Sequence, residues 1–174
     1  VELGIVKSLA RSETNFSGST FLSRDLAAKR VDLLKEIFPG VGKLAVLSNT
    51  LHPGERSEWE VTQQAATMLG IEPSYLPFAG PREFDAAMAN LEKVTADALL
   101  VFPEGVTMVN RKRIVQLAND RRLPSMFGWS EYCDAGGLLS YGANQRATYV
   151  RLAAYADRIL RGESPGNLPV EQPT

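Results

Sequence analysis

The sequence predicts an α/β fold of three layers, in which helices cover both faces of a mainly parallel, five-stranded sheet. From Lys43 onward, short apolar runs alternate with longer segments whose apolar residues recur at helical spacing. The run ADALLVFP at 96–103 is apolar almost throughout, which is typical of a central parallel strand buried on both faces. Because parallel strands need right-handed crossovers, we expect the helices on both sides of the sheet.

Five runs account for the predicted strands. They are KLAVLS (43–48), IEPSYLPF (71–78), ADALLVFP (96–103), LPSMFGW (123–129) and GLLSYG (137–142). Pro73 cannot donate a sheet hydrogen bond, so the second strand is predicted to be short or to lie at an edge. The glycines Gly136 and Gly137 separate the last strand from the segment before it.

Helical periodicity predicts six helices. They span about 1–11, 23–38, 56–69, 81–95, 107–122 and 145–160. Gly70 ends the third, Pro81 suits the first turn of the fourth, and Thr107 can cap the fifth. Four apolar residues of the last helix share one stripe and are expected to face inward: Tyr149, Leu152, Ala156 and Ile159. The tail at 164–174 is rich in proline and polar residues, so we predict a connection there and no regular element.

The composition excludes several classes of protein. A chain of 174 residues has the size of about one domain. Its formal net charge of -1 lacks the excess of Lys and Arg that binds phosphates, so no nucleic-acid partner is expected. The single cysteine, Cys133, permits neither an intrachain disulfide nor a CxxC motif. No apolar run approaches the length of about 18 residues that spans a membrane, and no signal-peptide pattern is visible.

Motifs of the common enzyme classes are also absent. The sequence contains no phosphate-binding GxxxxGK[ST] loop, no GxGxxG after the first strand and no GxSxG elbow. The only histidine, His52, lies in the loop HPGE without a partner at metal-ligand spacing, and is either a solvated loop residue or a cleft contact. We therefore predict no catalytic residue, no metal and no cofactor. A Ser-His-Asp triad assembled from distant segments would leave no such motif.

The candidate site lies where the predicted strands end. In an open parallel sheet, ligands bind beyond the carboxyl ends of the strands, where the direction of the crossovers reverses. Ten residues end or directly follow the first, third, fourth and fifth strands: Ser48, Asn49, Pro103, Glu104, Gly105, Gly128, Trp129, Ser130, Tyr141 and Gly142. Hydroxyls, an amide, a carboxylate and two aromatic rings are typical of a cleft for a small molecule.

Each of the prominent side chains has a structural alternative. Glu104 is either an exposed acid in the first turn of a helix, stabilised by the helix dipole, or a counter-charge for a ligand ammonium group. Trp129 is either a core or lid aromatic or a platform on which a ligand stacks. Ser130 can cap a helix, contact a ligand, or both, and Tyr141 can belong to the core. Asn144 is predicted to be the N-cap of the last helix.

Five segments carry a resemblance to a known family. They are SLAR…NFSG (8–18), KRVDLLKEIFPGVGKLAVLSN (29–49), ADALLVFPE (96–104), RRLPSMFGWSEYCDAGGLLSYG (121–142) and ADRILRGESPGNLPVEQPT (156–174). Together they resemble the ABC-transporter substrate-binding proteins of the tryptophan/tyrosine type. The most specific combination is DAGGLLSYG with the closing LPVEQPT.

The resemblance implies a type I periplasmic-binding-protein fold, in which two Rossmann-like lobes close on a small solute and deliver it to a membrane permease. Residues 1–20 would be the end of the first lobe and the hinge crossing, 21–164 the second lobe, and 165–174 a tail returning to the hinge. The rest of the first lobe and an export signal are expected upstream, which implies a periplasmic or other extracytoplasmic location.

The resemblance also implies a ligand class. Members of known ligand mostly take aromatic amino acids, held by loops that correspond to the ten positions above. Members that grip an amino group often have Asp, or Thr followed by Asp, where this sequence has Glu104 and Gly105. Glu104 and Gly105 depart from this amino-group pattern, while the resemblance as a whole implies an aromatic amino acid or a related compound as the solute. The alternatives are an enzyme on a doubly wound sheet and the ligand-sensing lobe of a transcription regulator.

Overall fold

The structure, a computed structural model, describes residues 5–172, which fall into two compact units. The sheet unit is Ser23–Gly142, and the flanking unit joins the residues before 23 to those after 142. All ten predicted site residues belong to the sheet unit. The predicted lobe boundaries at residues 20 and 164 stay a prediction. The compact units divide the chain elsewhere and group the helix at 145–160 with the N-terminal residues.

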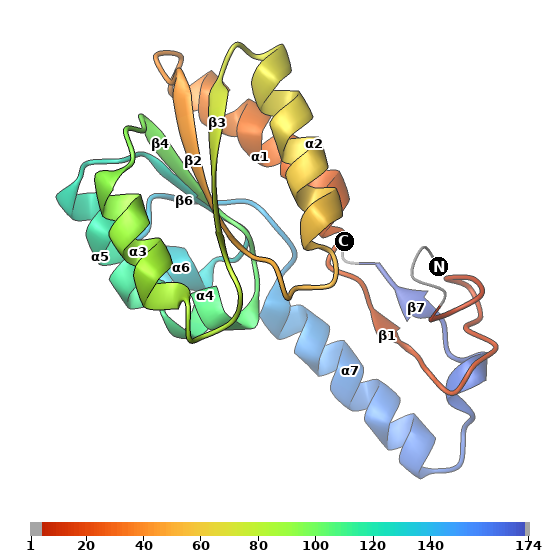
Figure 1. The fold of residues 1–174 in the computed structure, drawn as a ribbon. Coiled ribbons are helices and arrows are strands. Elements are labelled where there is room, and N and C mark those ends of the chain that lie inside the picture. The colour runs from red at the N-terminus through yellow and green to blue at the C-terminus, as the bar shows by residue number, and fades with distance from the viewer. Residues whose placement is uncertain (1–4, 173–174) are drawn as a thin grey trace. The chain divides into compact units, whose positions relative to one another are not determined.

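The sheet unit contains a parallel five-stranded sheet. Its strands are β2 (Lys43–Asn49), β3 (Glu72–Phe78), β4 (Ala98–Val101), β5 (Ser125–Phe127) and β6 (Leu139–Ser140). They lie in the order β3-β2-β4-β5-β6, and every neighbouring pair is parallel (Figure 1). This confirms the predicted α/β fold. The strand that contains Pro73 is an edge strand, as predicted.

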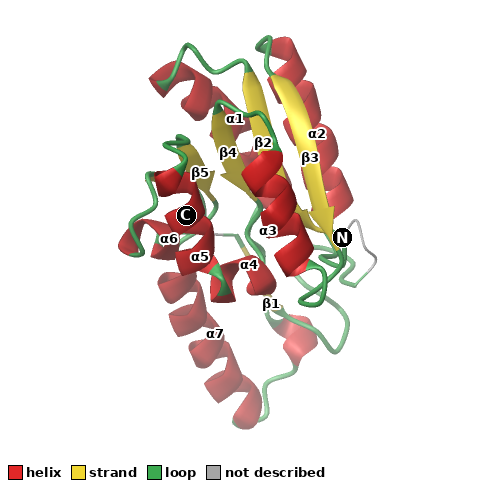
Figure 2. Ribbon diagram, turned by 60° about the vertical axis from the view of Figure 1, so that its left-hand side comes forward, coloured by secondary structure: helices red, strands yellow, loops and turns green. Residues whose placement is uncertain are grey.

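Six helices cover the two faces of this sheet. They are α1 (Ser23–Ile37), α2 (Glu55–Met68), α3 (Phe84–Lys93), α4 (Gly105–Val109), α5 (Arg111–Asp120) and α6 (Glu131–Asp134). Residues of α1 and α2 form one buried cluster with the sheet, and residues of α3, α5 and α6 form another, so α1 and α2 lie on one face (Figure 2). Successive strand residues alternate between the clusters: Leu44 and Val46 face α1 and α2, whereas Ala45 and Leu47 face α3.

Two predicted helix starts are wrong. Helix α3 begins at Phe84 because Pro81 lies in a turn, where Gly80 has a φ of 71° and Glu83 accepts a hydrogen bond from the Ala79 amide. Thr107 is not an N-cap, since its hydroxyl donates to the Phe102 carbonyl from inside α4. The predicted single helix at 107–122 is instead two helices, α4 and α5, which meet at Asn110.

The flanking unit differs most from the prediction. Residues 5–11 of the predicted first helix are irregular, and residues 1–4 lie outside the described part. Within the N-terminal segment, the Lys7 amide donates to the Ser12 carbonyl. The Val170 amide of the tail donates to the Leu9 carbonyl, so the tail satisfies a backbone acceptor of the N-terminal segment. The tail is not a plain connection, because it forms a 3₁₀ turn (Pro165–Asn167) and strand β7 (Val170–Glu171), which pairs with β1 (Gly18–Ser19).

Helix α7 (Gln145–Leu160) has the predicted bounds and the predicted Asn144 cap, which accepts from the Ala147 amide at 3.0 Å. Its predicted inward face is wrong. Thr148 and Tyr155 are its buried residues, and none of the four predicted residues is buried. The Tyr155 hydroxyl donates to the Pro169 carbonyl at 2.9 Å, which explains why this face packs inward. Among residues 5–172, no helix is both long enough and apolar enough to cross a bilayer.

Candidate functional site

The strand order places one polar pair at the point where the crossovers reverse. From β2 the chain runs to β3 on one side and then to β4 on the other, so this point lies between the ends of β2 and β4. Asn49 ends β2, and Glu104 follows β4. The Asn49 side-chain amide donates to Glu104 Oε2 at 3.0 Å. The two residues that the sequence predicted at these strand ends are therefore brought into direct contact.

Glu104 is the N-cap of α4. Its Oε2 accepts from the Val106 amide at 2.8 Å, and its Oε1 accepts from the Thr107 amide. A carboxylate at this position satisfies unpaired amides and meets the positive end of the helix dipole. The predicted structural alternative for Glu104 is therefore confirmed in its interaction with the helix dipole and wrong in its exposure, since only 6% of the residue is exposed. Three hydrogen bonds occupy three of its roughly four acceptor positions.

Asn49 is fixed equally well. Its Oδ1 accepts from the amides of Leu51 and Gly80, each at 3.1 Å, while its Nδ2 donates to Glu104. An asparagine amide carries two donor hydrogens, and only one points at the carboxylate. The pair therefore offers an oriented donor and a buried carboxyl group side by side at the strand ends.

Ser48 lies one residue deeper and has no exposed surface. Its hydroxyl donates to Glu55 Oε1 at 2.7 Å, and the same oxygen accepts from the Tyr75 hydroxyl. The Tyr75 ring stacks on Trp59 with 4.4 Å between ring centroids. Sequence reasoning missed Glu55 and Tyr75, although Glu55 follows directly on the loop that contains His52 and Gly54.

The loops after β4, β5 and β6 approach one another through glycines. A Cβ atom on Gly128 would lie 2.6 Å from the Pro103 ring, and one on Gly142 would lie 1.9 Å from the Gly128 carbonyl oxygen. Side chains at these two positions would therefore collide with their neighbours. Gly105, in contrast, faces open space, since a Cβ atom added there would meet nothing within 4 Å. We call the loops after β2, β4, β5 and β6 the rim.

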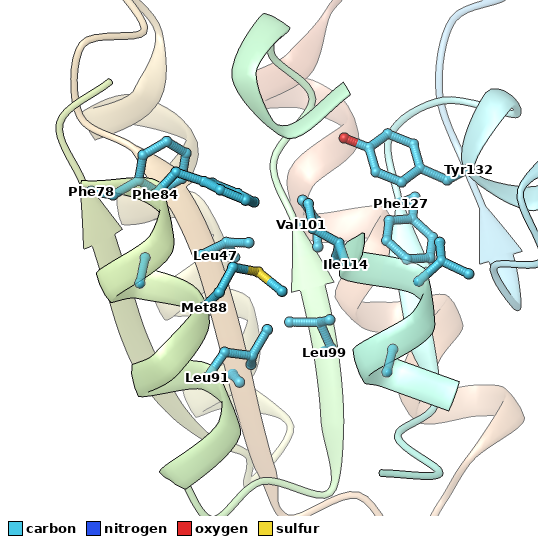
Figure 3. Packing of buried hydrophobic residues seen from close by; sticks show 14 of the residues in the cluster. Leu47, Phe78, Phe84, Met88, Leu91, Leu99, Val101, Ile114, Phe127 and Tyr132 are labelled. Atoms are coloured by element: carbon cyan, nitrogen blue, oxygen red, sulfur yellow. The ribbon is translucent and has the colours of Figure 1, made fainter. Parts of the chain in front are cut away.

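The aromatic residues of the rim divide between core and surface. Trp129 is 7% exposed and belongs to the cluster beneath α3, α5 and α6, whereas Tyr141 is 39% exposed. Tyr132, which the sequence analysis did not single out, stacks on Phe127 with 4.5 Å between centroids (Figure 3). Burial raises the pKa of Tyr132, and its buried hydroxyl has no hydrogen-bond partner among the residues described. Ser130 stands exposed at the start of α6, where its side chain makes no capping hydrogen bond.

A buried ion pair supports the rim from the face that α1 and α2 cover. Arg30 Nη1 donates to Glu58 Oε1 at 2.7 Å, and Arg30 Nε donates to the Tyr141 carbonyl at 2.8 Å. Both charged side chains are at most 1% exposed. Burial raises the pKa of Glu58 to about 7, although Arg30 opposes the change, and burial lowers the pKa of Arg30. The signal in the sequence was a charge on an apolar stripe, since Arg30 shares its helix face with Ala27 and Leu34.

The described residues contain no group of three His, Cys, Asp or Glu side chains that could hold a metal ion. The rim instead combines a buried carboxyl group, an amide donor, an exposed hydroxyl and an exposed aromatic ring. These groups can hold a small polar molecule by hydrogen bonds and charge.

Comparison with known proteins agrees with this fold. All residues from 1 to 174 match the family described as ABC transporter substrate binding protein. The chain belongs to this family. Its membership confirms the resemblance found in the five sequence segments.

Relatives of this substrate-binding chain are longer than it is. A tyrosine-binding protein of Clostridioides difficile (strain R20291) is 25% identical over 171 residues, which cover 98% of this chain and 48% of that protein. The crystal structure of a conserved domain protein from Vibrio cholerae is 26% identical with a TM-score of 0.82, over 100% of this chain and 58% of the other. An ABC domain from Streptococcus pneumonia, in complex with L-Trp, is 19% identical with a TM-score of 0.82 and covers 99% and 59%. The chain thus spans about half the length of the curated relative.

Proposed function

We propose that this chain supplies one lobe of the solute-binding component of an ABC uptake transporter. The component acts outside the cytoplasm, binds a small molecule between this lobe and a second one, and hands it to a membrane permease. It catalyses no reaction. The ten residues predicted from the strand ends form this lobe's share of the solute site, in which the fully buried Ser48 and the core residue Trp129 support their neighbours from beneath.

The observation that carries the proposal is the Asn49–Glu104 pair at the reversal point of the sheet. A buried carboxylate is costly unless it has partners, and Glu104, at 6% exposure, has the oriented Asn49 amide as one of them. Such a pair suits a solute with an ammonium group and a hydrogen-bond acceptor, which is the polar end of an amino acid. The tyrosine-binding relative supports L-tyrosine as the first candidate.

The test is calorimetric titration of the full-length protein with L-tyrosine, with L-tryptophan as a second probe. Glu104→Gln removes the charge and keeps only one of the two acceptor oxygens, so the variant's Tm is measured alongside to show that the α4 cap and the fold survive. We expect it to weaken binding at least about ten-fold, which corresponds to about 1.4 kcal/mol. Glu60→Gln is the matched control, because Glu60 lies on α2 with an exposed side chain. Unchanged affinity in Glu104→Gln would remove Glu104 from the site.

The aromatic part of the proposed site needs a gentler substitution. Trp129 is a core residue, so its replacement by alanine would disturb the fold as well as any solute. Tyr141→Leu removes an exposed ring and its hydroxyl while keeping an apolar side chain. We expect Tyr141→Leu to lower the affinity for L-tyrosine without lowering Tm. Equal affinities of Tyr141→Leu and the wild type would exclude Tyr141 from the solute site.

A further inference from the structure

We infer that Arg30 is a positioning residue for the rim: its guanidinium, oriented by Glu58, fixes the Tyr141–Gly142 loop at the place where a solute is held. The effect on solute binding rests on the proposed function, whereas the effect on the loop does not. Arg30 itself is buried beneath the loop and has no role as a solute contact.

The hydrogen bonds of Arg30 reach two elements at once. Nε donates to the Tyr141 carbonyl and Nη1 donates to Glu58 on α2, so one planar group joins α1, α2 and the loop after β6. The Tyr141 amide donates to the Phe127 carbonyl at 2.9 Å, which holds the same residue from the side of β5. Tyr141 is therefore fixed at both backbone groups while its side chain remains exposed.

The contact continues along the rim. A Cβ on Gly142 would lie 3.5 Å from Arg30 Nη2, so the guanidinium packs along the backbone of this loop. Gly142 in turn lies against the Gly128 carbonyl, and Gly128 lies against Pro103, next to Glu104. Close packing transmits a displacement of one loop to the next. If the Tyr141–Gly142 loop lost its hydrogen bond to Arg30, we therefore expect the displacement to reach Gly128, Pro103 and the neighbouring Glu104 carboxylate.

The cost of desolvation indicates that the Arg30–Glu58 pair contributes more to the position of the loop than to the free energy of unfolding. Desolvating two charges offsets most of their attraction, and well-packed apolar residues of similar volume often give equal or greater stability. The second oxygen of Glu58 has no hydrogen-bond partner in the described part of the chain, so the pair is not even fully satisfied. What the guanidinium offers, and an apolar side chain does not, is a directed bond to a loop carbonyl.

The test compares two double variants of the full-length protein. Arg30→Met with Glu58→Leu removes the buried pair without leaving one charge alone. Arg56→Met with Glu60→Leu removes an exposed pair of α2, whose side chains are 91% and 56% exposed, and serves as the control. Two quantities are measured: hydrogen–deuterium exchange of segment 138–144, and the affinity for L-tyrosine by calorimetry.

We expect the buried-pair variant to keep a Tm near that of the wild type, while exchange in 138–144 becomes at least about ten-fold faster and binding at least about ten-fold weaker. Arg30→Lys should also accelerate exchange in segment 138–144, because lysine retains the charge but lacks the planar guanidinium that donates to Tyr141 and Glu58 at once. The control should match the wild type in both measurements.

Unchanged exchange and unchanged affinity in a stable buried-pair variant would overturn the inference. So would loss of folding in that variant, because the pair would then be needed for the fold itself. If exchange accelerates but even the wild type binds neither L-tyrosine nor L-tryptophan, the positioning role stands and the proposed ligand class fails.

Discussion

Glycine at two rim positions sets how closely the strand-end loops approach. Gly142 faces the Gly128 carbonyl so closely that a methyl group has no room. We expect Gly142→Ala to lower the free energy of unfolding by about 1–3 kcal/mol, because the added atom forces a backbone shift. Urea denaturation measures the change. Gly105→Ala is the control, since Gly105 is the first residue of α4 with open space around it, and it should be neutral or slightly stabilising. Equal losses in both variants would contradict the steric explanation.

The buried core also sets the cost of changing Trp129. The side chain is 7% exposed within a cluster that includes Phe127 and Tyr132. We expect Trp129→Ala to lower the free energy of unfolding by about 3–5 kcal/mol and Trp129→Phe by clearly less, because phenylalanine refills most of the volume. Thermal and urea unfolding of the two variants give the comparison. A Trp129→Ala protein as stable as the wild type would contradict a contribution of this ring to the stability of the core.

At the scale of elements, we expect the stability of the α1–α2 contact to depend on pH through Glu58. Glu58 has a pKa of about 7 in the folded protein against 4.5 as its ordinary value, and the charged groups facing it are Arg30 of α1 and Glu55 of α2. Between these two pKa values the folded state binds more protons than the unfolded state. The free energy of unfolding contributed by Glu58 is therefore fully present below pH 4.5 and is lost as the pH rises from 4.5 through about 7.

We expect Glu58→Gln to abolish this contribution, on the order of 1–3 kcal/mol across that window. Glutamine keeps an oxygen that accepts from Arg30 but does not titrate. Urea denaturation at several pH values between 4.5 and 7 measures the slope of each protein. Glu60→Gln, an exposed change on the same helix, should leave the wild-type slope intact. A Glu58→Gln slope equal to that of the wild type would show that Glu58 does not titrate in this range.

Sequence periodicity predicted the elements of the sheet unit well, because its strands and helices bury apolar residues against the sheet core. Every strand and the helices on both faces appear near their predicted positions, and the strand-end rule placed Asn49 beside Glu104. The failures are local. Pro81 and Thr107 obeyed helix-start preferences, but Gly80 and Glu104 supplied the real turn and cap. A cap is decided by which side chain reaches the free amides, and sequence spacing alone leaves that choice open.

The predicted site lacked its supporting residues for a related reason. The strand-end rule finds residues near the carboxyl ends of strands, and Arg30 and Glu58 lie within helices. Their link to the rim is a contact between residues 111 positions apart, from Arg30 to Tyr141. Such a contact depends on the folded arrangement of α1 and β6. The charge on an apolar helix stripe was the available sign, and it indicates a buried polar group without naming its partner.

The flanking unit shows how a long-range partner overrides a local pattern. The apolar residues at 5–11 suit a helix, yet this segment is irregular and Leu9 accepts a hydrogen bond from Val170. A contact between residues so far apart in sequence produces no periodic pattern. The proline-rich tail was therefore predicted to contain no regular element, whereas its strand β7 pairs with β1. A short helix is only marginally stable by itself, so its loss costs little free energy when long-range contacts favour another conformation.

At the scale of the whole molecule, the length of the relatives bears on how a solute is held. The tyrosine-binding relative is about twice as long as the matched region, since the alignment covers 48% of it. If a solute is enclosed between two lobes, the rim of residues 1–174 provides only part of its contacts, and the entropic cost of binding is offset by fewer interactions. We expect residues 1–174 alone to bind L-tyrosine at least about 100-fold more weakly than the full-length protein, a difference of about 2.7 kcal/mol.

Calorimetry on the two lengths of the protein measures this difference directly. Circular dichroism and thermal unfolding of residues 1–174 must show a folded α/β protein, so that weak binding reflects missing contacts and not a missing fold. Glu104→Gln in the full-length protein separates the two contributions, because under the proposed two-lobe arrangement it alters only the share of residues 1–174. Submicromolar affinity of residues 1–174 alone would contradict the two-lobe account and would place the complete solute site within this chain.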